Sequence, residues 1–412
     1  MSVRSFAPAM ALAIASLATA DEPAPPDTTA LVAQHSYAFA FTATTLEGAG
    51  ADFLRAQAAR SQFVLLGEEH MDHLIPIFAG ALYRMLHDAH GFRHLVVEQD
   101  PVAIEDALAP AMRGAVDEIA ALSKRYPSLF EFDSDEDLTF LATVGGLEDN
   151  ADAIWGVEQA TGAIRYLDEL MTLAPDAAVR AEVQALLDAA RAADAEPKYS
   201  VNWLIAPTTP AALDDLAAAF AAEPGPRAAR LIASLAKSSE IFGYYRRAEA
   251  GEFVGLYNNT VREEVLKANF LERYRAVAKR EALPKVMFKF GSNHLYHGRN
   301  PTQAFPIGNL AHEFAIVNGM EAYGLYVQPL GAGYVGFKDF PEWMRPLLPA
   351  TEPAVPTLID LRALRPYQRL FREKVAPADQ WQLRDLVNGY DAIVLLPGSK
   401  SSSRKLGGRE SS

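Results

Sequence analysis

Cysteine is absent from this 412-residue chain. Its absence excludes disulfides, a lipid-modified cysteine near the amino terminus, a cysteine nucleophile and thiolate metal ligands. Any bound metal must therefore be held by His, Asp, Glu or carbonyl oxygen. Because 50% of the residues are apolar, the chain has ample material for a large core, and we expect its stability to come from that core.

Positive charge is also scarce. The chain has 38 Lys and Arg residues against 52 Asp and Glu residues, which gives a formal net charge of −14. Such a surface repels phosphate backbones, and no Lys/Arg cluster interrupts it before the tail. Nucleic acid is therefore not expected as a partner. A small neutral or cationic ligand, or a peptide, fits this charge better.

Apolar runs long enough to cross a membrane are missing after the first twenty residues, so no stable membrane insertion is expected. Arg4, an apolar stretch from Phe6 to Leu17 and the sequence Ala18-Thr19-Ala20 are typical of a signal peptide that is cleaved before Asp21. An uncleaved anchor is the alternative for the same stretch. We expect an exported protein, periplasmic or secreted, that has lost residues 1–20.

Two common enzyme signatures are missing as well. There is no Gly-x-Ser-x-Gly elbow, so the serine mechanism of α/β-hydrolases lacks its nucleophile. No Gly-x-Gly-x-x-Gly follows a strand pattern, which argues against a dinucleotide site. The chain is expected to hold a flexible lead-in (21–49), one α/β domain (50–398) and a Ser-, Gly- and Arg-rich disordered tail (399–412).

Apolar runs of strand length recur along the chain. The first is followed by a helix pattern that Asp72 can cap and Gly91 can end, and then by the second run, so these two strands should be parallel and adjacent. From about 160 to 283 the pattern is mostly helical. We therefore predict an α/β fold with an open, mostly parallel central sheet flanked by helices, and a helical insertion or cap in the middle. The strand runs are Phe63–Gly67, Phe92–Glu98, Ala153–Val157, Lys285–Phe290, Phe314–Val317, Ala322–Val327, Thr357–Leu361 and Asp391–Leu396.

Two segments share the pattern Gly-x-x-His-x-x-His, and each follows an apolar run directly: Gly67–His73 and Gly291–His297. In open parallel sheets, ligands bind beyond the carboxyl ends of the strands, which is where both segments are placed. Glycine lets the chain turn sharply off a strand, so the histidine three residues later can point over the sheet edge. We therefore expect His70 and His294 to be the principal site residues.

Carboxylates are expected at the same rim, because Glu98 and Glu158 end two further apolar runs. Side chains alternate along a strand, so only one of Glu68 and Glu69 is expected to face the site. Histidines and carboxylates that converge at one rim suit general acid/base catalysis or a metal site. Supporting, substrate-binding positions are expected for the second histidine of each segment, His73 and His297.

Two alternatives stay open for these residues. Glu98 can instead cap a helix that begins after Pro101, which is a purely structural role. A divalent metal such as Mn²⁺ or Zn²⁺ can be held by His70, Glu98 and His294, because histidine and carboxylate ligands serve metal sites as well as metal-free acid/base chemistry.

The first segment, with its helix and Val96-Val97-Glu98, resembles the opening of the superfamily that joins erythromycin esterases, ChaN-like haem-binding proteins and Tiki/TraB proteins. Gly291–His294 looks like the second glycine–histidine motif of that superfamily. Thr260–Glu264 with Asn269 is similar to the Arg-Glu and Asn segment of erythromycin-esterase-like proteins, and Tyr390–Val394 resembles their closing strand. The spacing of Gly67 to His70 is closer to the ChaN-like and Tiki forms.

The resemblance implies roles for individual residues. His70 would be the general base that activates water, assisted by Glu68 or Glu69, while Glu98 and His294 complete the site. Arg262 would steady a substrate carbonyl or carboxylate. The leading hypothesis is then an exported hydrolase of ester, lactone or peptide bonds with an activated water and, in one variant, a divalent metal. A haem- or metal-binding protein without turnover is the alternative.

Overall fold

The computed structural model describes residues 25–148, 152–195, 202–220, 225–331, 336 and 339–406. The expected signal peptide and the final residues of the tail, 407–412, lie outside the described residues. No helix in the described ranges combines the length and apolar character that a membrane span requires.

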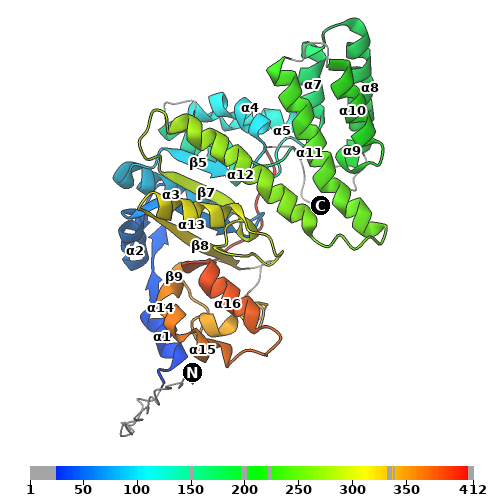
Figure 1. The fold of residues 1–412 in the computed structure, drawn as a ribbon. Coiled ribbons are helices and arrows are strands. Elements are labelled where there is room, and N and C mark those ends of the chain that lie inside the picture. The colour runs from blue at the N-terminus through cyan, green and yellow to red at the C-terminus, as the bar shows by residue number, and fades with distance from the viewer. Residues whose placement is uncertain are drawn as a thin grey trace, which may run out of the picture.

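Eight strands form one open sheet with the order β1-β9-β10-β8-β4-β7-β5-β6 (Figure 1). The six strands from β10 to β6 pair in parallel, whereas β9 runs antiparallel to both of its neighbours. The predicted fold class, with an open and mostly parallel sheet, is confirmed. The strands are β1 (Ser36–Ala38), β4 (Ser61–Glu68), β5 (His94–Val97), β6 (Ile154–Gly156), β7 (Val286–Gly291), β8 (Glu321–Leu330), β9 (Thr357–Asp360) and β10 (Ala392–Pro397), with β2 (Ala40–Phe41) and β3 (Leu46–Glu47) as a separate pair.

The strand–helix–strand unit at the start of the domain differs from its prediction in one respect. Asp72 caps α3 (Leu74–His90) by accepting hydrogen bonds from the backbone N–H groups of Leu74 and Ile75, and Gly91 ends the helix with φ 73°. However, β4 and β5 are parallel without being adjacent, because β7 lies between them and pairs with both. The expected adjacency of these two strands is therefore wrong. The end of β7 lies between the ends of β4 and β5 at the same edge of the sheet.

Helices cover both faces of the sheet, and the strand side chains alternate between two cores. In β4, Val64 and Leu66 face one core while Phe63 and Leu65 face the other. The first core packs against α2 (Ala49–Ala58), α3, α4 (Pro101–Met112), α5 (Val116–Arg125) and α6 (Asp135–Leu147). The second packs against α1 (Thr28–Gln34), α12 (Tyr257–Val277), α13 (Ile307–Val317), α14 (Leu361–Leu364), α15 (Gln368–Arg372) and α16 (Gln380–Gly389), with short 3₁₀ turns at Arg345–Leu347 and Arg365–Tyr367.

Between β6 and β7, the described residues form helices with a small core of their own. Figure 1 shows α7 to α10 as a bundle that projects away from the sheet, and the long helices α11 and α12 connect this bundle to the sheet. This is where a helical insertion was expected. The helices are α7 (Ile164–Leu173), α8 (Ala177–Asp194), α9 (Asn202–Ile205), α10 (Thr209–Phe220), α11 (Pro226–Glu249) and α12.

Two further expectations are corrected by the structure. Residues Phe314–Val317 belong to α13 and not to a strand, because Ile307, Ala311 and Ala315 are buried at helical spacing and this pattern extends through the β-branched residues. The lead-in, expected to be flexible over 21–49, contains α1 and the sheet strand β1.

Candidate active site

Both glycine–histidine segments lie at the carboxyl edge of the sheet, on neighbouring strands. β4 and β7 pair with Gly67 opposite Phe290 and Glu68 opposite Gly291. The other neighbour of β7 is β5, so Glu98, directly after β5, lies beside Gly291 and accepts a hydrogen bond from its backbone N–H at 2.6 Å. Three strand ends, rather than two, therefore meet at this rim.

Glu98 lies at the centre of the side chains at the rim. Its Oε1 is 3.2 Å from Nε2 of His294 and accepts a hydrogen bond from Arg262 at 2.8 Å, while its Oε2 is 3.9 Å from Nε2 of His70. Burial acts to raise the pKa of Glu98, but the positive charges around it outweigh burial and hold this pKa well below its usual range. The alternative of Glu98 as a helix cap is wrong, because Asp100 caps α4.

Gly291 is required by the packing of His70. A Cβ atom at this position would lie 2.5 Å from Nε2 of His70 and 3.3 Å from Oε2 of Glu98. Gly67 is required for another reason, since a Cβ there would collide with the Tyr390 ring. Gly291 has an ordinary extended conformation, with φ −53° and ψ 138°. Glycine is therefore needed at these two positions because a side chain there would collide with a neighbouring side chain. The sharp turn that was expected does not explain them.

His70 is a half-buried imidazole held from two sides. Its Nδ1 lies 3.2 Å from Oε1 of Glu68, and its ring stacks on Phe132 with the centroids 4.1 Å apart. Burial lowers the pKa of His70, but the hydrogen bond to Glu68 and the charges of Glu98 and Glu68 outweigh it, so the pKa is raised above its ordinary 6.5.

Glu68 is the member of the Glu68/Glu69 pair that faces the site, and Glu69 is exposed. The buried Glu68 carboxylate contacts Lys289 Nζ at 2.6 Å, and Lys289 also donates to Asp137 at 2.9 Å. Burial favours the neutral carboxyl, yet Lys289 and His70 lower the pKa of Glu68. Lys289 was not predicted, although a lysine inside a buried strand run signals that an acidic partner lies nearby.

His294 is fully enclosed by carboxylates. It ends a 3₁₀ turn (Ser292–His294), and its Nδ1 lies 2.6 Å from Glu263 while its Nε2 faces Glu98. Burial opposes the charged ring, but Glu98 and Glu263 raise its pKa to about 10. Glu263 is itself fixed by the backbone N–H of Ile307 at 2.8 Å. His294 is therefore a cation at neutral pH, and Glu263 is a site residue that the sequence motifs included without assigning it a role.

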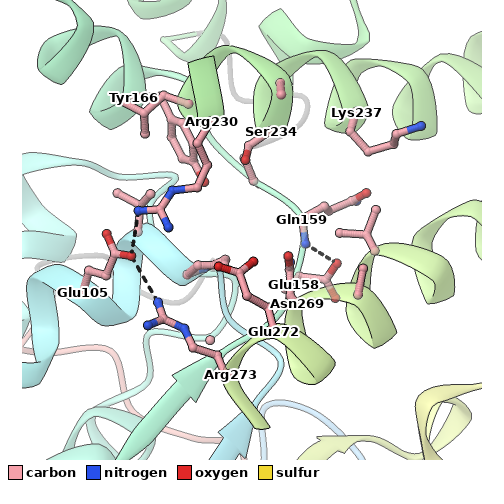
Figure 2. Close-up of a pocket in the computed structure, with 18 residues that line it drawn as sticks. Glu105, Glu158, Gln159, Tyr166, Arg230, Ser234, Lys237, Asn269, Glu272 and Arg273 are labelled. Carbon is pink, nitrogen blue, oxygen red and sulfur yellow. Dashed lines mark hydrogen bonds and ion pairs between the residues drawn. The ribbon is translucent and has the colours of Figure 1, made fainter. Parts of the chain in front are cut away.

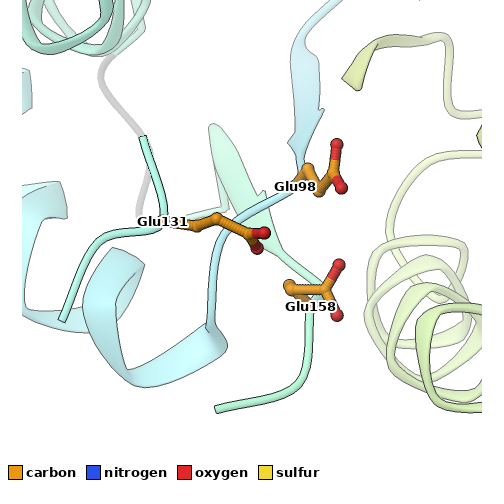
Figure 3. A group of neighbouring side chains, drawn as sticks. All are labelled: Glu98, Glu131 and Glu158. Carbon is orange, nitrogen blue, oxygen red and sulfur yellow. The ribbon is translucent and has the colours of Figure 1, made fainter. Parts of the chain in front are cut away.

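Arg262, on α12, binds a cluster of three glutamates that end or flank the neighbouring strands (Figure 3). Its guanidinium lies 2.6 Å from Glu158, 2.8 Å from Glu98 and 3.5 Å from Glu131. Glu158 also receives the Nε–H of Arg262. The structure therefore places Arg262 as the partner of these acids. Glu131, on the loop after α5, was not among the expected site residues.

The residues at the rim do not fit a divalent metal in this arrangement. Both ring nitrogens of His294 already face carboxylates, Nδ1 facing Glu263 and Nε2 facing Glu98. The Glu98, Glu131 and Glu158 oxygens lie within 4.8 Å of one another. However, the Arg262 guanidinium already forms ion pairs with all three carboxylates and supplies the positive charge that a metal ion would bring. The same enclosure of His294 disfavours axial ligation of haem, so the arrangement matches acid/base chemistry better than either cofactor.

The second histidines of the two segments do not join this rim. The Nδ1 of His73 is 3.1 Å from the backbone N–H and C=O of Lys400. His297 stacks on His312 with the ring centroids 4.5 Å apart and lies 3.4 Å from Glu313. Neither imidazole contacts Glu98 or His294 in the described interactions. The substrate-binding role expected for His73 and His297 thus gains no support from their positions.

The tail residues 399–406, called here the C-terminal strap, cross over the His70 loop. The Ser399 hydroxyl donates to Asp72, the backbone N–H of His73 donates to the Lys400 carbonyl at 3.1 Å, and Ser402 N–H donates to the Met71 carbonyl at 2.8 Å. Asp72 and Ser401 form an antiparallel bridge. The expectation of a disordered tail is therefore wrong for residues 399–406.

The strap stabilises a strained turn. Met71, next to His70, has φ 66°, a conformation that residues with a Cβ rarely adopt. The Arg404 guanidinium reaches back to the Met71 sulfur at 3.4 Å and lies 3.3 Å from Asp133. The strap also donates from Leu406 N–H to Asp135 at the start of α6, at 2.9 Å. Strap, turn and α6 together hold His70 in place.

We expect a chain that ends at Gly398 to lose this restraint while it keeps its fold. The backbone N–H of His73 donates a hydrogen bond to the Lys400 carbonyl of the strap. Without the strap, this N–H should exchange with solvent faster in hydrogen-exchange mass spectrometry. A chain that lacks only 407–412 is the matched control. Unchanged exchange around His73 in the shorter chain would contradict the strap's role.

A cleft of about 310 Å³ lies beside the Arg262 cluster, between the sheet domain and the helical insertion. Arg262 and Glu131 form its polar floor, and Arg404 of the strap reaches its wall. The side-chain oxygen of Gln159 is buried here without a hydrogen-bond partner. The rest of the lining mixes polar side chains with an apolar and aromatic part, which is made of Pro127, Phe130, Ile241, Phe242 and Tyr245.

A second cavity, of about 270 Å³, lies behind Glu158, between α4, α11 and α12 (Figure 2). Its charged lining is largely paired: Glu105 lies 3.4 Å from Arg230 and 3.1 Å from Arg273. These pairs join the insertion to the sheet domain. Glu158 lines this cavity while Arg262 lines the cleft, so their ion pair separates the two spaces.

Comparisons with known proteins agree with the structure at the level of the fold. No protein-family model matches the chain, and no curated protein matches it by sequence. Solved structures that resemble it include a Bacillus cereus protein (12% identity, TM-score 0.56, 92% of this chain and 99% of that one). A mutant of the erythromycin esterase EreC in its open conformation has 13% identity and TM-score 0.57, covering 85% and 94%. A succinoglycan biosynthesis protein has 12% identity and TM-score 0.54, covering 92% and 98%.

Identities this low show a shared fold alone. The erythromycin esterase among these structures nevertheless matches the superfamily that the glycine–histidine motifs resemble. The fold is thus one that a known hydrolase also uses.

Proposed function

We propose that this protein is a hydrolase of ester or lactone bonds in which His70 is the general base that activates a water molecule. The observation that carries the proposal is an imidazole fixed by a buried carboxylate, Glu68, at the end of a parallel strand and beside a second buried carboxylate, Glu98. The fold likeness to an erythromycin esterase supports the reaction class. Peptide bonds are the second substrate class to test.

The geometry around His70 suits a water between two acceptors. Glu68, kept ionised by Lys289, accepts the Nδ1–H and so leaves Nε2 as the basic nitrogen. Nε2 and Oε2 of Glu98 are 3.9 Å apart, a separation that one hydrogen-bonded water can bridge. In the proposed reaction the water passes a proton to Nε2 and its oxygen attacks the carbonyl carbon of the ester.

The positive charges at the rim have two effects on this step. Arg262 and His294 keep Glu98 ionised, so that it can accept the second hydrogen of the water. Arg262 also lies in the floor of the cleft, where it presents positive charge to the oxyanion that forms on the carbonyl oxygen. The apolar part of the cleft's lining, with Phe130, Phe242 and Tyr245, gives the rest of the substrate an apolar surface to contact.

The pH dependence of turnover tests the base directly. With a nitrophenyl ester, whose leaving group needs no proton, kcat/KM should rise with pH, because only neutral His70 accepts a proton. The midpoint should lie above 6.5, since the carboxylates raise the pKa of His70. A rise centred below 6.5, or no rise at all, would contradict His70 as the base.

A substrate panel tests the reaction class. Purified protein should hydrolyse at least one member of a set of alkyl, aryl and lactone esters, and it should do so in the presence of a chelator, because the rim holds its charge balance without a metal. Peptides in the same panel distinguish a peptidase from an esterase. No turnover on any ester or peptide, with or without added Mn²⁺ or Zn²⁺, would sink the proposal.

We also propose that the chain is exported and cleaved after Ala20. The apolar stretch and the small residues before Asp21 support this. Intact-mass analysis of protein recovered from outside the cytoplasm should give a chain that starts at Asp21. Recovery of a chain that retains Met1 from that fraction would contradict cleavage.

A further inference from the structure

Glu131 is a carboxyl group that the proposed mechanism does not yet use. It lies on the loop between α5 and α6, between the cleft and the Arg262 cluster. The side chain of Gln99 holds the backbone of this loop through two hydrogen bonds. Its oxygen accepts from the Glu131 N–H at 3.0 Å, and its amide nitrogen donates to the Phe132 carbonyl at 3.0 Å. The position of Glu131 is therefore fixed by the strand end that also carries Glu98.

The surroundings of Glu131 favour its protonated form. Its Oε2 is buried without a hydrogen-bond partner and lies 3.5 Å from Arg262. The charged groups that face it are Glu98, Glu158, His70 and Arg262. Burial and the two glutamates raise its pKa to about 7, although Arg262 and His70 act in the opposite direction. Arg262 is shared with Glu158 and Glu98, which hold it at shorter distances.

We propose that Glu131 is a second catalytic residue, the general acid that donates a proton to the leaving alkoxide. This inference rests on the proposed hydrolase function. It is carried by the placement of a partly buried carboxyl group in the cleft floor, with one oxygen that lacks a hydrogen-bond partner, on the loop whose next residue, Phe132, stacks on the general base. Base and acid then approach the substrate from two neighbouring positions on one rim.

The proton and bond balance of the reaction closes with these two groups. His70 takes one proton from water, and the remaining hydroxide adds to the carbonyl carbon to give a tetrahedral oxyanion. When that intermediate collapses, the bond to the leaving oxygen breaks and Glu131 donates its proton, so an alcohol departs. The acid product releases its own proton to solvent, and the proton on His70 returns to Glu131 through water. No further reactant is needed.

The other acidic hydrogens at the rim are less suited to this step. Both nitrogens of His294 face carboxylates, Glu263 and Glu98, so its hydrogens point away from the cleft. Lys289 is buried against Glu68 and Asp137 on the far side of His70. Arg262 stays charged throughout. Glu131 is the carboxyl group that lines the cleft while having a pKa near neutrality.

A comparison of leaving groups tests the inference. Glu131→Gln keeps the shape of the side chain and removes its acidic proton. For an alkyl ester, whose alkoxide must be protonated, kcat/KM should fall about a hundredfold or more. For the nitrophenyl ester of the same acid it should stay close to wild type. An equal loss on both esters would show a structural role and overturn the proposal, and so would no loss on the alkyl ester.

The pH profile gives a second, independent readout. Wild-type kcat/KM for the alkyl ester should fall again at alkaline pH, as Glu131 loses its proton, whereas the nitrophenyl ester should show no such fall. In Glu131→Gln the alkaline fall should vanish, and Glu131→Asp should restore part of the alkyl-ester activity. A fall that persists in Glu131→Gln would overturn the assignment.

Failure of this inference is distinct from failure of the proposed function. Suppose that His70→Ala removes turnover while Glu131→Gln changes kcat/KM equally for both esters. His70 is then retained as the general base, and Glu131 is rejected as the general acid. If wild-type protein hydrolyses no ester or peptide, both fail. Urea unfolding of each variant shows whether a lost activity reflects a lost fold.

Discussion

Replacing His70 by alanine lowers kcat/KM for ester hydrolysis by about a hundredfold to ten-thousandfold. The substitution removes the proton acceptor, and the neighbouring acids are poor replacements. In the variant, Lys289 still lowers the pKa of Glu68, and His294 and Arg262 still lower that of Glu98, so both carboxylates remain weak bases. Steady-state kinetics on the best ester of the panel measures the loss.

The His70 variant should fold like the wild type, because the imidazole side chain is 35% exposed and contributes little to the core. Its urea midpoint checks this point. His35→Gln is the matched control: His35 is half-buried after α1, beside the edge strand β1 at the opposite side of the sheet. Wild-type activity is expected for the control. Wild-type activity in His70→Ala would remove the proposed base.

Replacing Arg262 by leucine should reduce the free energy of unfolding by about 3–5 kcal/mol. The substitution leaves Glu158 and Glu98 buried without the cation that lies 2.6 and 2.8 Å from them. Removing one partner of a buried ion pair costs more than the pair contributes, since the remaining charge is neither solvated nor compensated. Urea unfolding at pH 8 measures this change.

The pH dependence of the Arg262→Leu defect follows from protonation. A carboxyl whose folded pKa is raised, as that of Glu131 is to about 7 from 4.5, contributes stability that is present below 4.5 and is lost as the pH rises through 7. Arg262 acts to lower the pKa of Glu131 and of Glu98, so without it both pKa values move upward and the defect should shrink between pH 8 and pH 5.

The matched control for this variant is Arg113→Leu, which breaks the exposed ion pair with Glu118. A pair of this kind is worth at most about 1 kcal/mol. If Arg262→Leu cost no more than Arg113→Leu at pH 8, the account of Arg262 as the compensating charge would be wrong.

The parts of the site that the sequence predicted are those fixed by strand ends. His70, Glu98 and His294 each end an apolar run or follow one within four residues, and parallel strands bring such positions to one edge. The order of strands was not predictable from local patterns. Nothing in the run from Val286 to Gly291 says that it pairs between β4 and β5, because pairing depends on packing over long sequence separations.

The residues that the sequence did not reveal reach the site from loops and helices. Glu131 lies in a loop with no periodic pattern, and Glu263 is one of two adjacent glutamates on α12. Which helix face meets the rim is decided by tertiary packing, so the chemistry of these side chains was invisible in the motif. The strap was missed for a related reason: a Ser- and Arg-rich composition favours disorder, but specific hydrogen bonds to Asp72 and Met71 hold it.

The position of β7 between β4 and β5 has a consequence for how the chain folds. During synthesis, β4 and β5 are complete long before Val286 appears, and each then offers an unpaired apolar edge to any other chain. Pairing over such a distance in sequence is slow. The rim at the ends of β4, β7 and β5 is therefore among the last features to form. Substitutions that delay the docking of β7 should first appear as aggregation during expression, before any loss of native stability can be measured.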